Sequence, residues 1–325
     1  MMVSLEQIYE PVKDDLVQVD KAIEAAVDIE SGFVSSLLGH VLKGGGKRMR
    51  PVITLLAAKF HTYDLDTLVH QAAAVEVLHT ATLVHDDAID RSATRRGKVT
   101  VSAGWGDSRA ILLGDYLLAK AAELCAMTEN PHVVRLCART LMIISSGELE
   151  QSAFTFDLGQ AKSQYYRWIA AKTAALFAMA AESVGVLSGA PEKEVAMLKD
   201  YGQNLGMAFQ VIDDILDFSG DETLMGKPTG EDLRQGVITL PGILYIEKNH
   251  SDSLVKEIFE IVASRDTGKL RELTSRIRES PHIAESHKIA ESYSGKARRA
   301  LAGMPDGKPR KCLTDLVDYA LERKK

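Results

Sequence analysis

The stretch from Val75 to Val101 reads VEVLHTATLVHDDAIDRSATRRGKVTV. It begins as an apolar run with helical spacing and then places Asp86, Asp87 and Asp90 within five positions. On a helix of about 3.6 residues per turn, these three carboxylates share one sector. Like charges clustered beside an apolar stripe repel one another and are partly desolvated, so we expect a cation to neutralise them. A lone D-D-x-x-D motif is also typical of a solvated acidic helix end.

The same spacing recurs from Phe209 to Phe218, FQVIDDILDF, where Asp213, Asp214 and Asp217 lie on a second apolar run. Little polar surface surrounds this copy, so a solvated helix end explains it less well. Two such clusters on separate helices predict a shared cavity across which carboxylates hold hard divalent cations. Mg²⁺ fits best, because it keeps several waters and is usually held by a few carboxylates together with substrate phosphates.

The bulk composition is that of a globular protein with a large core. The chain has 325 residues, of which 46% are hydrophobic and 26% charged. A net charge of -6 argues against a general nucleic-acid binder. The three cysteines lack C-x-x-C spacing and are interpreted as small buried residues in a reducing cytosol.

Neither a secretory signal nor a membrane span is predicted. The first residues are acidic and mixed rather than basic and then apolar. The most apolar segment, Trp168 to Ala190, is interrupted by Lys172 and Glu182 and is interpreted as a buried helix. We therefore expect a cytoplasmic protein without a transmembrane segment.

Helical periodicity runs through almost every segment, and strand alternation is nearly absent. This predicts an all-α fold: a single large helical bundle around a deep central cavity. We expect one domain over residues 1–325, with the helices after about residue 250 more loosely attached. The expected helices are 4–28, 31–42, 48–60, 64–91, 103–127, 131–157, 161–188, 191–218, 239–249, 252–263, 267–278, 282–303 and 309–323.

A basic segment, KGGGKRMRP from Lys43 to Pro51, follows the first helices. Glycines before a helix leave backbone N–H groups open to an anion, and Lys47, Arg48 and Arg50 add positive charge. We interpret this segment as a phosphate site; an ordinary surface basic cluster is the alternative.

Further cations accumulate around the acidic motifs: Arg95 and Arg96 just after the first, Lys172 midway, and Lys227 shortly after the second. Together they suit a substrate that carries a diphosphate, with metal ions between phosphates and aspartates. Lys227 lies in a long loop, Ser219 to Thr239, which exceeds a plain helix connection and is interpreted as a flap. A mobile surface loop is the alternative.

Two uncharged polar residues lie near the aspartates. His79 lies seven residues before Asp86, on nearly the same helix face. A helical histidine is as often a packed core residue as a ligand. Gln210 lies three residues before Asp213, from where it reaches a phosphate or a metal-bound water.

Taken together, these residues resemble the trans-isoprenyl diphosphate synthases, also called polyprenyl synthetases. The resemblance covers about Lys43 to Pro241. It includes, in order, GGKRMRP, EVLHTATLVHDDAID, the TRRG turn, GDYLLA, Lys172-Thr173, FQVIDDILD and GKPTGEDLRQG. Several ordered motifs of this kind are highly specific.

The resemblance implies a role for each candidate residue. Two or three Mg²⁺ ions would be bound with the diphosphate by Asp86, Asp87, Asp90, Asp213, Asp214 and Asp217. Contacts to an allylic diphosphate would come from Arg95, Lys172 and Lys227. Isopentenyl diphosphate would be bound by Lys47, Arg50, His79 and Arg96, with Thr173 and Gln210 as flanking polar contacts. The residues implied in catalysis itself are Asp86, Asp90, Arg95, Lys172, Asp213 and Lys227.

The implied reaction joins isopentenyl diphosphate to a dimethylallyl, geranyl or farnesyl diphosphate. The allylic C–O bond breaks, the double bond of isopentenyl diphosphate attacks the allylic cation, and the departing pyrophosphate takes the proton that is lost. Ala81 and Thr82 lie about one turn before the aspartates, where farnesyl-type relatives tend to carry aromatic residues. Small residues there predict a deep tunnel and an all-trans product longer than C15, of geranylgeranyl or greater length.

Other interpretations stay open. A farnesyl diphosphate synthase is the alternative within the family, and a subunit of a heteromeric synthase is another. A terpene cyclase would normally replace the second aspartate cluster with a mixed Asn/Ser/Glu motif. A helical scaffold would bind no diphosphate in the presence of Mg²⁺. Resemblance also implies a homodimer.

Overall fold

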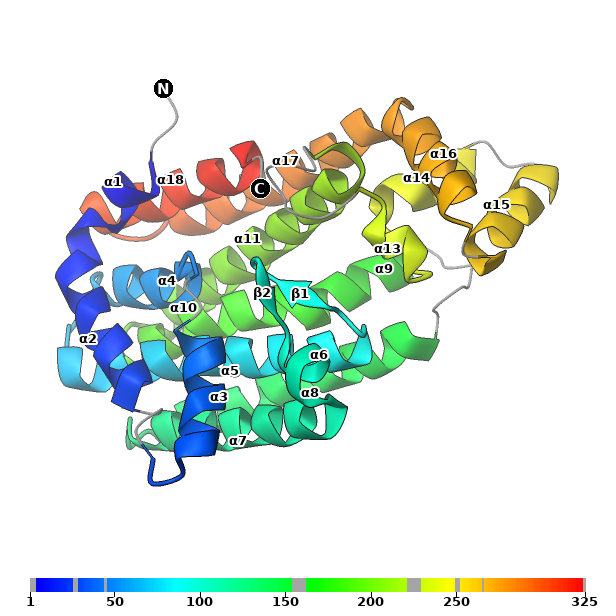
Figure 1. The fold of residues 1–325 in the computed structure, drawn as a ribbon. Helices are drawn as coiled ribbons and strands as arrows, with labels where there is room; N and C mark the ends of the chain where they lie inside the picture. Colours follow the sequence, from blue (N-terminus) through cyan, green and yellow to red (C-terminus); the bar gives the residue numbers. More distant parts are fainter. Residues whose placement is uncertain are drawn as a thin grey trace. The chain divides into compact units, whose positions relative to one another are not determined.

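The computed structural model of this chain describes residues 4–25, 29–43, 46–153, 162–220, 229–248, 252–264 and 266–323. These residues are almost entirely helical (Figure 1). The strands in this described part are β1 (Thr94–Arg95) and β2 (Lys98–Val99), which pair as one short antiparallel hairpin. The predicted all-α fold class is confirmed.

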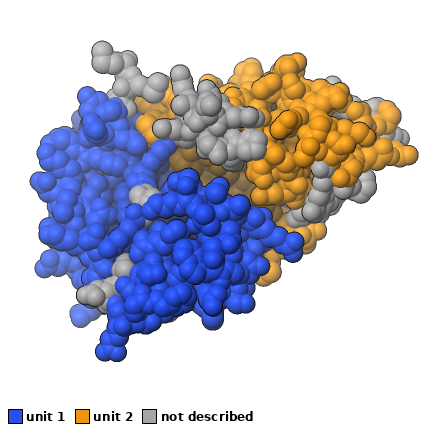
Figure 2. All heavy atoms as spheres, viewed as in Figure 1, with its two compact units in different colours: residues 1–141, 176–202, 300–316 blue, residues 142–175, 203–299, 317–325 orange. Residues whose placement is uncertain are grey.

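The helices form two compact units, coloured separately in Figure 2. Unit 1 consists of residues 1–141, 176–202 and 300–316, and unit 2 consists of residues 142–175, 203–299 and 317–325. The division falls within α8 (Pro131–Ala153), α10 (Ala175–Leu187), α11 (Glu192–Ser219), α17 (His282–Leu301) and α18 (Lys308–Glu322). A single domain around a central cavity, with a loosely attached part after residue 250, stays a prediction.

Unit 1 is built around α5 (Leu65–Ile89), the helix of the first aspartate motif (Figure 1). The helices packed against α5 are α2 (Lys13–Ala25), α3 (Gly32–Leu42), α4 (Met49–Ala58), α6 (Val101–Trp105) and α7 (Asp107–Ala126). A helix that is apolar on all sides is a core helix, and Ala72, Val75 and Leu78 are at most 1% exposed. This packing holds the end of α5, and therefore its aspartates, in a fixed place.

The core of unit 2 is one apolar cluster that includes Tyr165, Ile212, Phe218 and Leu273. It is formed largely by α9 (Lys162–Ile169), α11, α14 (Leu240–Lys248), α15 (Asp252–Ser264) and α16 (Thr267–Arg278). The cluster takes up the apolar side chains between and beside the aspartates of α11. Carboxylates on that side of α11 are consequently drawn into the protein interior.

Two predicted helices are interrupted by residues with special backbone requirements. The expected helix 4–28 is divided into α1 (Leu5–Tyr9), η1 (Glu10–Val12) and α2, because Pro11 lacks an N–H donor. The expected helix 103–127 is divided into α6 and α7 at Gly106, whose φ of 93° favours glycine.

Two further differences concern segments close to the predicted site. The expected continuous helix 161–188 contains a π-helical turn, η2 (Ala170–Ala174), between α9 and α10. The long loop expected between Ser219 and Thr239 contains a short helix, α13 (Glu231–Arg234). Residues 221–228, with Lys227 among them, lie outside the described residues.

One helical stretch among the described residues, Lys162–Leu187, is long and apolar enough to cross a membrane. Inside the structure, 72% of its apolar window is buried, as in the core helix of a soluble protein. The absence of a transmembrane segment stays a prediction.

The cysteines Cys125, Cys137 and Cys312 are all buried, have free thiols and belong to unit 1. The Cys125 thiol donates to Gln71 Oε1 at 3.6 Å. Their interpretation as small buried side chains is confirmed.

Candidate active site

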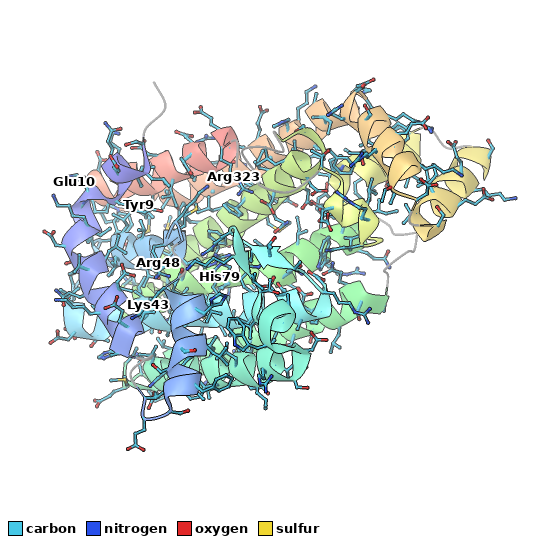
Figure 3. The ribbon with its side chains drawn as sticks, in the orientation of Figure 1. Tyr9, Glu10, Lys43, Arg48, His79 and Arg323 are labelled. Carbon is cyan, nitrogen blue, oxygen red and sulfur yellow. The ribbon has the colours of Figure 1, made fainter. Side chains whose placement is uncertain are left out.

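The basic segment from Lys43 to Pro51 runs into the start of α4, and its arginines Arg48 (labelled in Figure 3) and Arg50 have different surroundings. Arg48 caps α4 with a left-handed φ of 49°. Its guanidinium donates to Glu76 at 2.9 Å and to Asp20 at 3.1 Å, so most of its charge is compensated within unit 1. Glu76 is only 4% exposed, and this buried acid accounts for the position of Arg48.

Arg50, in contrast, packs against the aromatic ring of Phe177. Its Cζ lies 4.4 Å from the centroid of the Phe177 ring, and its buried Nε has no hydrogen-bond partner among the described residues. Burial, with a smaller contribution from nearby Arg96, lowers the pKa of Arg50 to about 10, and Glu76 opposes this effect. Arg50 is therefore still cationic at neutral pH and has donor capacity for an anion.

His79 is an uncharged polar group among these cations. Burial and the charges of Arg50 and Arg96 hold the pKa of His79 well below its ordinary value of 6.5, with weaker contributions from Arg95 and Arg48. A neutral imidazole offers one donor and one acceptor and adds no positive charge.

Arg96 lies at the tip of the β1–β2 hairpin, with a φ of 52°. Its guanidinium is in close contact with the backbone of Gly46: a Cβ at that position would lie 2.8 Å from Nη1. The residue after Gly46 is also held in place, because the Tyr9 hydroxyl donates to the backbone carbonyl of Lys47 at 2.6 Å. The glycine of this basic segment therefore makes room for a cation.

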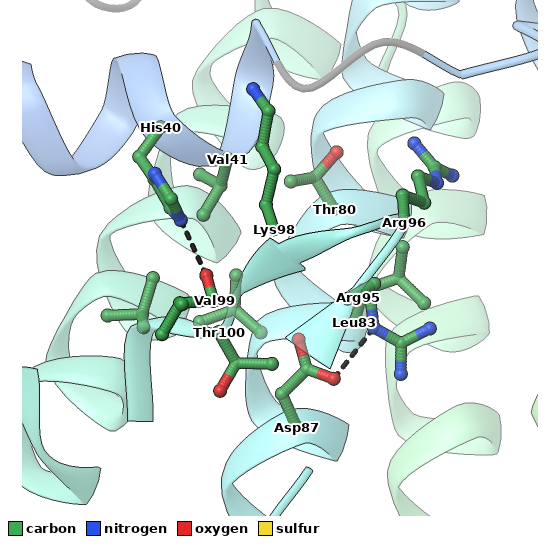
Figure 4. Close-up of a pocket in the computed structure, with 12 residues that line it drawn as sticks. His40, Val41, Thr80, Leu83, Asp87, Arg95, Arg96, Lys98, Val99 and Thr100 are labelled. Carbon is green, nitrogen blue, oxygen red and sulfur yellow. Dashed lines mark hydrogen bonds and ion pairs between the residues drawn. The ribbon is translucent and has the colours of Figure 1, made fainter. Parts of the chain in front are cut away.

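The aspartates of the first motif differ in exposure. Asp86 is half-buried, Asp87 is 6% exposed, and Asp90 is exposed at the end of α5. Arg95 Nε donates to Asp87 Oδ1 at 2.7 Å (Figure 4). Burial raises the pKa of Asp87, and the Arg95 guanidinium opposes this rise.

A small pocket with a volume of about 70 Å³ opens beside this ion pair (Figure 4). Its polar lining includes Asp87, Arg95, Arg96 and Lys98. His40 Nε2 donates to the Val99 carbonyl at 2.7 Å, which ties the hairpin to α3. The sequence analysis did not single out Lys98, although it follows the TRRG turn directly.

The second motif presents one exposed carboxylate. Asp213 has a side chain that is 55% exposed, and it accepts a hydrogen bond from Arg323 Nη2 at 2.8 Å. Asp214 is 2% exposed and accepts from the Tyr165 hydroxyl at 2.5 Å and from Gln210 Nε2 at 2.8 Å. Burial raises the pKa of Asp214 to about 7, although both donors act in the opposite direction.

Asp217 is also only 2% exposed. Its Oδ2 accepts from the backbone N–H of Asp232 at 3.2 Å, which ties the start of α13 to α11. This carboxylate has a structural contact within unit 2.

The turn η2 carries Lys172 and Thr173, and π-helical turns of this kind are frequent at functional sites. Thr173 Oγ1 donates to Gln210 Oε1 at 2.6 Å, so the turn is connected through Gln210 to Asp214. Lys172 forms an ion pair with Glu148 at 2.8 Å.

The two residues predicted to control product length differ in environment. Ala81 is fully buried in unit 1. Thr82 is half-buried, and its hydroxyl donates to the backbone carbonyl of His79 at 2.8 Å.

The structure thus assembles the predicted residues within each unit. Unit 1 gathers Arg50, His79 and Arg96, and it pairs Asp87 with Arg95. Unit 2 links Thr173, Gln210 and Asp214. The facing of the two aspartate clusters stays a prediction.

No group of three or more acidic, histidine or cysteine side chains in the described residues has a ready metal-binding arrangement. The buried aspartates explain this, because they turn toward protein donors.

Sequence reasoning missed several contributors to this site: Glu76, Tyr165 and Arg323. Glu76 had a signal, since an acid inside an apolar helical run requires a buried cation. Tyr165 and Arg323 lie 49 and 110 residues from their aspartate partners in the sequence, and no local sequence pattern indicated these contacts.

Comparison with known protein families shows the family of this chain. Residues 32–277 match the family model described as polyprenyl synthetase. The chain belongs to the polyprenyl synthetase family.

Among relatives in this family, heptaprenyl diphosphate synthase component 2 of Geobacillus stearothermophilus is 39% identical, over 98% of this chain and 99% of the relative. The octaprenyl diphosphate synthase of Escherichia coli is 33% identical over 98% and 99% of the two chains. Both polyprenyl synthetases are thus similar over nearly their full length.

Solved polyprenyl synthetase structures are similar in fold. A polyprenyl synthase from Caulobacter crescentus, complexed with calcium and isoprenyl diphosphate, has a TM-score of 0.95 and 34% identity, and the match covers 100% of this chain and 99% of that chain. A decaprenyl diphosphate synthase from Rhodobacter capsulatus has a TM-score of 0.92 and 34% identity, over 99% and 100%. The predictions of the family, of the helical fold and of a trans-prenyltransferase are confirmed.

Proposed function

We propose that this chain condenses isopentenyl diphosphate with an allylic diphosphate to give an all-trans polyprenyl diphosphate longer than C15. The observation that supports this most strongly is the cation cluster of unit 1, in which Arg50 and Arg96 lie near a neutral His79. Excess positive charge, together with the buried Nε of Arg50 that lacks a partner among the described residues, suits a substrate that brings several negative charges.

Isopentenyl diphosphate is assigned to this cluster, with Lys47, Arg50, His79 and Arg96 as its contacts. The buried Nε of Arg50, which lacks a partner among the described residues, supports this role. The allylic diphosphate is assigned to Arg95 and Lys172, together with Lys227. Both Arg95 and Lys172 are bonded to acids, so each would exchange one anionic partner for another.

The donor set of the two motifs fits Mg²⁺. Carboxylate oxygens are hard ligands, and those of Asp86, Asp90 and Asp213 reach solvent, so we assign the cations to these residues. The buried Asp87, Asp214 and Asp217 are assigned to holding the neighbouring segments in place. When bound, Mg²⁺ stabilises the negative charge that develops on the leaving pyrophosphate.

The protein's own contribution is to position and stabilise charge. Fixed guanidinium and ammonium groups stabilise developing negative charge better than water does, because they need no reorganisation during the reaction. The neutral state of His79 lets it donate a hydrogen bond to a phosphate oxygen without retaining the product by charge. Pyrophosphate itself is assigned as the acceptor of the final proton.

A direct test is chromatography of the products formed from isopentenyl diphosphate and each allylic starter, with and without Mg²⁺. We expect Mg²⁺-dependent products longer than C15. A failure to form any prenyl product would contradict the proposal.

Product length is assigned in part to Ala81, because it is small and fully buried on α5. Replacing it by Phe adds an aromatic ring to the core of unit 1. With farnesyl and isopentenyl diphosphates, Ala81→Phe should shift the product distribution to shorter chains. An unchanged product distribution in Ala81→Phe would contradict the assignment of product length to Ala81.

A subunit role in a heteromeric synthase is the second candidate function. It is favoured by the relative named as component 2 of a heptaprenyl diphosphate synthase. Turnover by the purified chain alone would contradict it, whereas turnover only after a second protein is added would support it.

A homodimer in the cytoplasm is the assembly and location that we propose. In unit 1, α7 exposes Ile111 and Leu112 by 50% and 67%, and exposed apolar side chains of this kind are typical of an interface. The mass in solution, measured by light scattering, and cell fractionation test these two assignments.

A further inference from the structure

Arg323, the residue after α18, binds to α11 within unit 2 (Figure 3). Its Nη2 donates to the backbone carbonyl of Phe209 at 2.9 Å and to Asp213 Oδ1 at 2.8 Å. Its Cζ also lies 3.7 Å from the centroid of the Phe209 ring. One guanidinium group therefore bonds both the backbone and the first aspartate of the second motif.

The burial of the two partners is unequal. The Arg323 side chain is 5% exposed, whereas that of Asp213 is 55% exposed. Burying a guanidinium costs free energy unless charged or polar partners compensate. The Nε of Arg323 is buried without a partner in the described part of the chain, so this compensation is incomplete. The bond to Asp213 is its charge-compensating contact.

The contacts with Phe209 connect the end of α18 to α11. The additional bond to Asp213 restricts the rotamer of the exposed carboxylate. A carboxylate has two oxygens with about four acceptor positions, so one bond from Arg323 leaves capacity for another ligand. Groups that orient a metal ligand in this way typically change metal affinity by about 10–100-fold when removed.

We infer that Arg323 is a positioning residue, which fixes Oδ1 of Asp213 so that the rest of the carboxylate is presented to a divalent cation. This inference rests on the proposed function. The charge of Arg323 repels the cation and so acts against the gain from orientation. The charge of Arg323 is spread over the guanidinium, which weakens its repulsion of the cation, whereas its two hydrogen bonds to α11 are directional. We therefore expect the gain in metal affinity from orienting Asp213 to exceed the loss from repulsion.

The experiment measures the Mg²⁺ concentration that gives half-maximal binding of an unreactive farnesyl thiodiphosphate, by equilibrium dialysis. Arg323→Met should raise this concentration 10–100-fold. Arg323→Lys should raise it less, because an ammonium group is a point donor without the planar fork of Arg. Arg298→Met is the matched control: it removes another arginine that contacts α18, at Asp318, and should behave as wild type.

A double-mutant cycle separates positioning from general damage. If Arg323 acts through Asp213, then Arg323→Met added to Asp213→Asn should change Mg²⁺ dependence less than about two-fold. Equal losses in both backgrounds would overturn the inference. So would unchanged or tighter Mg²⁺ binding by Arg323→Met, since tighter binding would mean that Arg323 competes with the cation.

Thermal unfolding without ligand verifies that each variant is folded. If Arg323→Met fails to fold, Arg323→Lys decides, because it keeps the aliphatic packing: wild-type Mg²⁺ dependence in that variant overturns the inference. Lack of Mg²⁺-dependent binding by the wild type would instead refute the proposed function. The two failures are therefore distinguishable.

Discussion

The two aspartate motifs share one spacing and differ in what surrounds their middle residue. In unit 1, Asp87 is bonded by the cation Arg95. In unit 2, Asp214 is bonded by the neutral donors Tyr165 and Gln210. A cation compensates the charge of a buried carboxylate, whereas neutral donors stabilise it only through hydrogen bonds. Burial raises the pKa of both carboxylates; the Arg95 guanidinium opposes the rise at Asp87, whereas the pKa of Asp214 is raised to about 7 despite its two neutral donors.

The ends of the motifs differ as well. Asp90 is exposed at the end of α5, whereas Asp217 is buried under α13. The first motif thus presents Asp86 and Asp90 to solvent, and the second presents Asp213. The shared spacing of the two motifs therefore does not mean that all six aspartates have the same role.

The largest expected effect concerns the exposed aspartates. Asp86→Ala and Asp213→Ala should each lower kcat/KM by about 100-fold or more, since a key electrostatic contact contributes about 3 kcal/mol or more to the transition state. Asp66→Ala on α5 and Asp200→Ala on α11 are controls, because both residues are exposed on the same helices. Activity within a few-fold of wild type in Asp86→Ala or Asp213→Ala would contradict the metal assignment.

A smaller effect should distinguish the partners of the buried aspartates. Arg95→Met removes the cation beside Asp87 and should lower the free energy of unfolding by about 2 kcal/mol, the cost of leaving a buried acceptor poorly satisfied. Tyr165→Phe removes one of two donors to Asp214 and should cost about 1 kcal/mol. Urea unfolding measures both. A larger loss in Tyr165→Phe than in Arg95→Met would reverse the comparison.

A separate expected effect concerns the pH dependence of stability. Because the pKa of Asp214 is raised from 3.8 to about 7 in the folded protein, the folded state binds more protons than the unfolded state between these values. This residue therefore reduces stability as the pH rises from about 4 to about 7, and its effect is constant above that.

Asp214→Asn removes that titration. Its stability relative to wild type should rise between pH 4 and pH 7, as measured by thermal unfolding over the same range. A difference that is independent of pH would show that Asp214 titrates normally.

Much of the fold was predictable because helix boundaries are local. The expected helix 267–278 coincides with α16, and the expected helix 64–91 matches α5 within two residues at each end. The breaks at Pro11 and Gly106 had local signals that the periodicity analysis passed over. The π-helical turn η2 had no local signal in the sequence, because it depends on how Lys172 and Thr173 pack within unit 2.

The candidate site was predictable in its residue types and less so in their partners. Charge spacing indicated Arg50, Arg96 and the aspartates. It did not indicate that Arg48 forms an ion pair with Glu76, or that Arg323 donates a hydrogen bond to Asp213, because these contacts join segments far apart in the sequence. Such pairs are decided by tertiary packing.

The burial of all three cysteines in unit 1 provides a built-in reporter. A maleimide added to the native protein reaches Cys125, Cys137 or Cys312 only after that unit opens, so the labelling rate follows its local unfolding. Trp168 is buried in unit 2, and once Trp105 of unit 1 is replaced by Phe its fluorescence offers a separate signal there. Selective labels of this kind make it possible to ask whether the halves melt in one step or in succession.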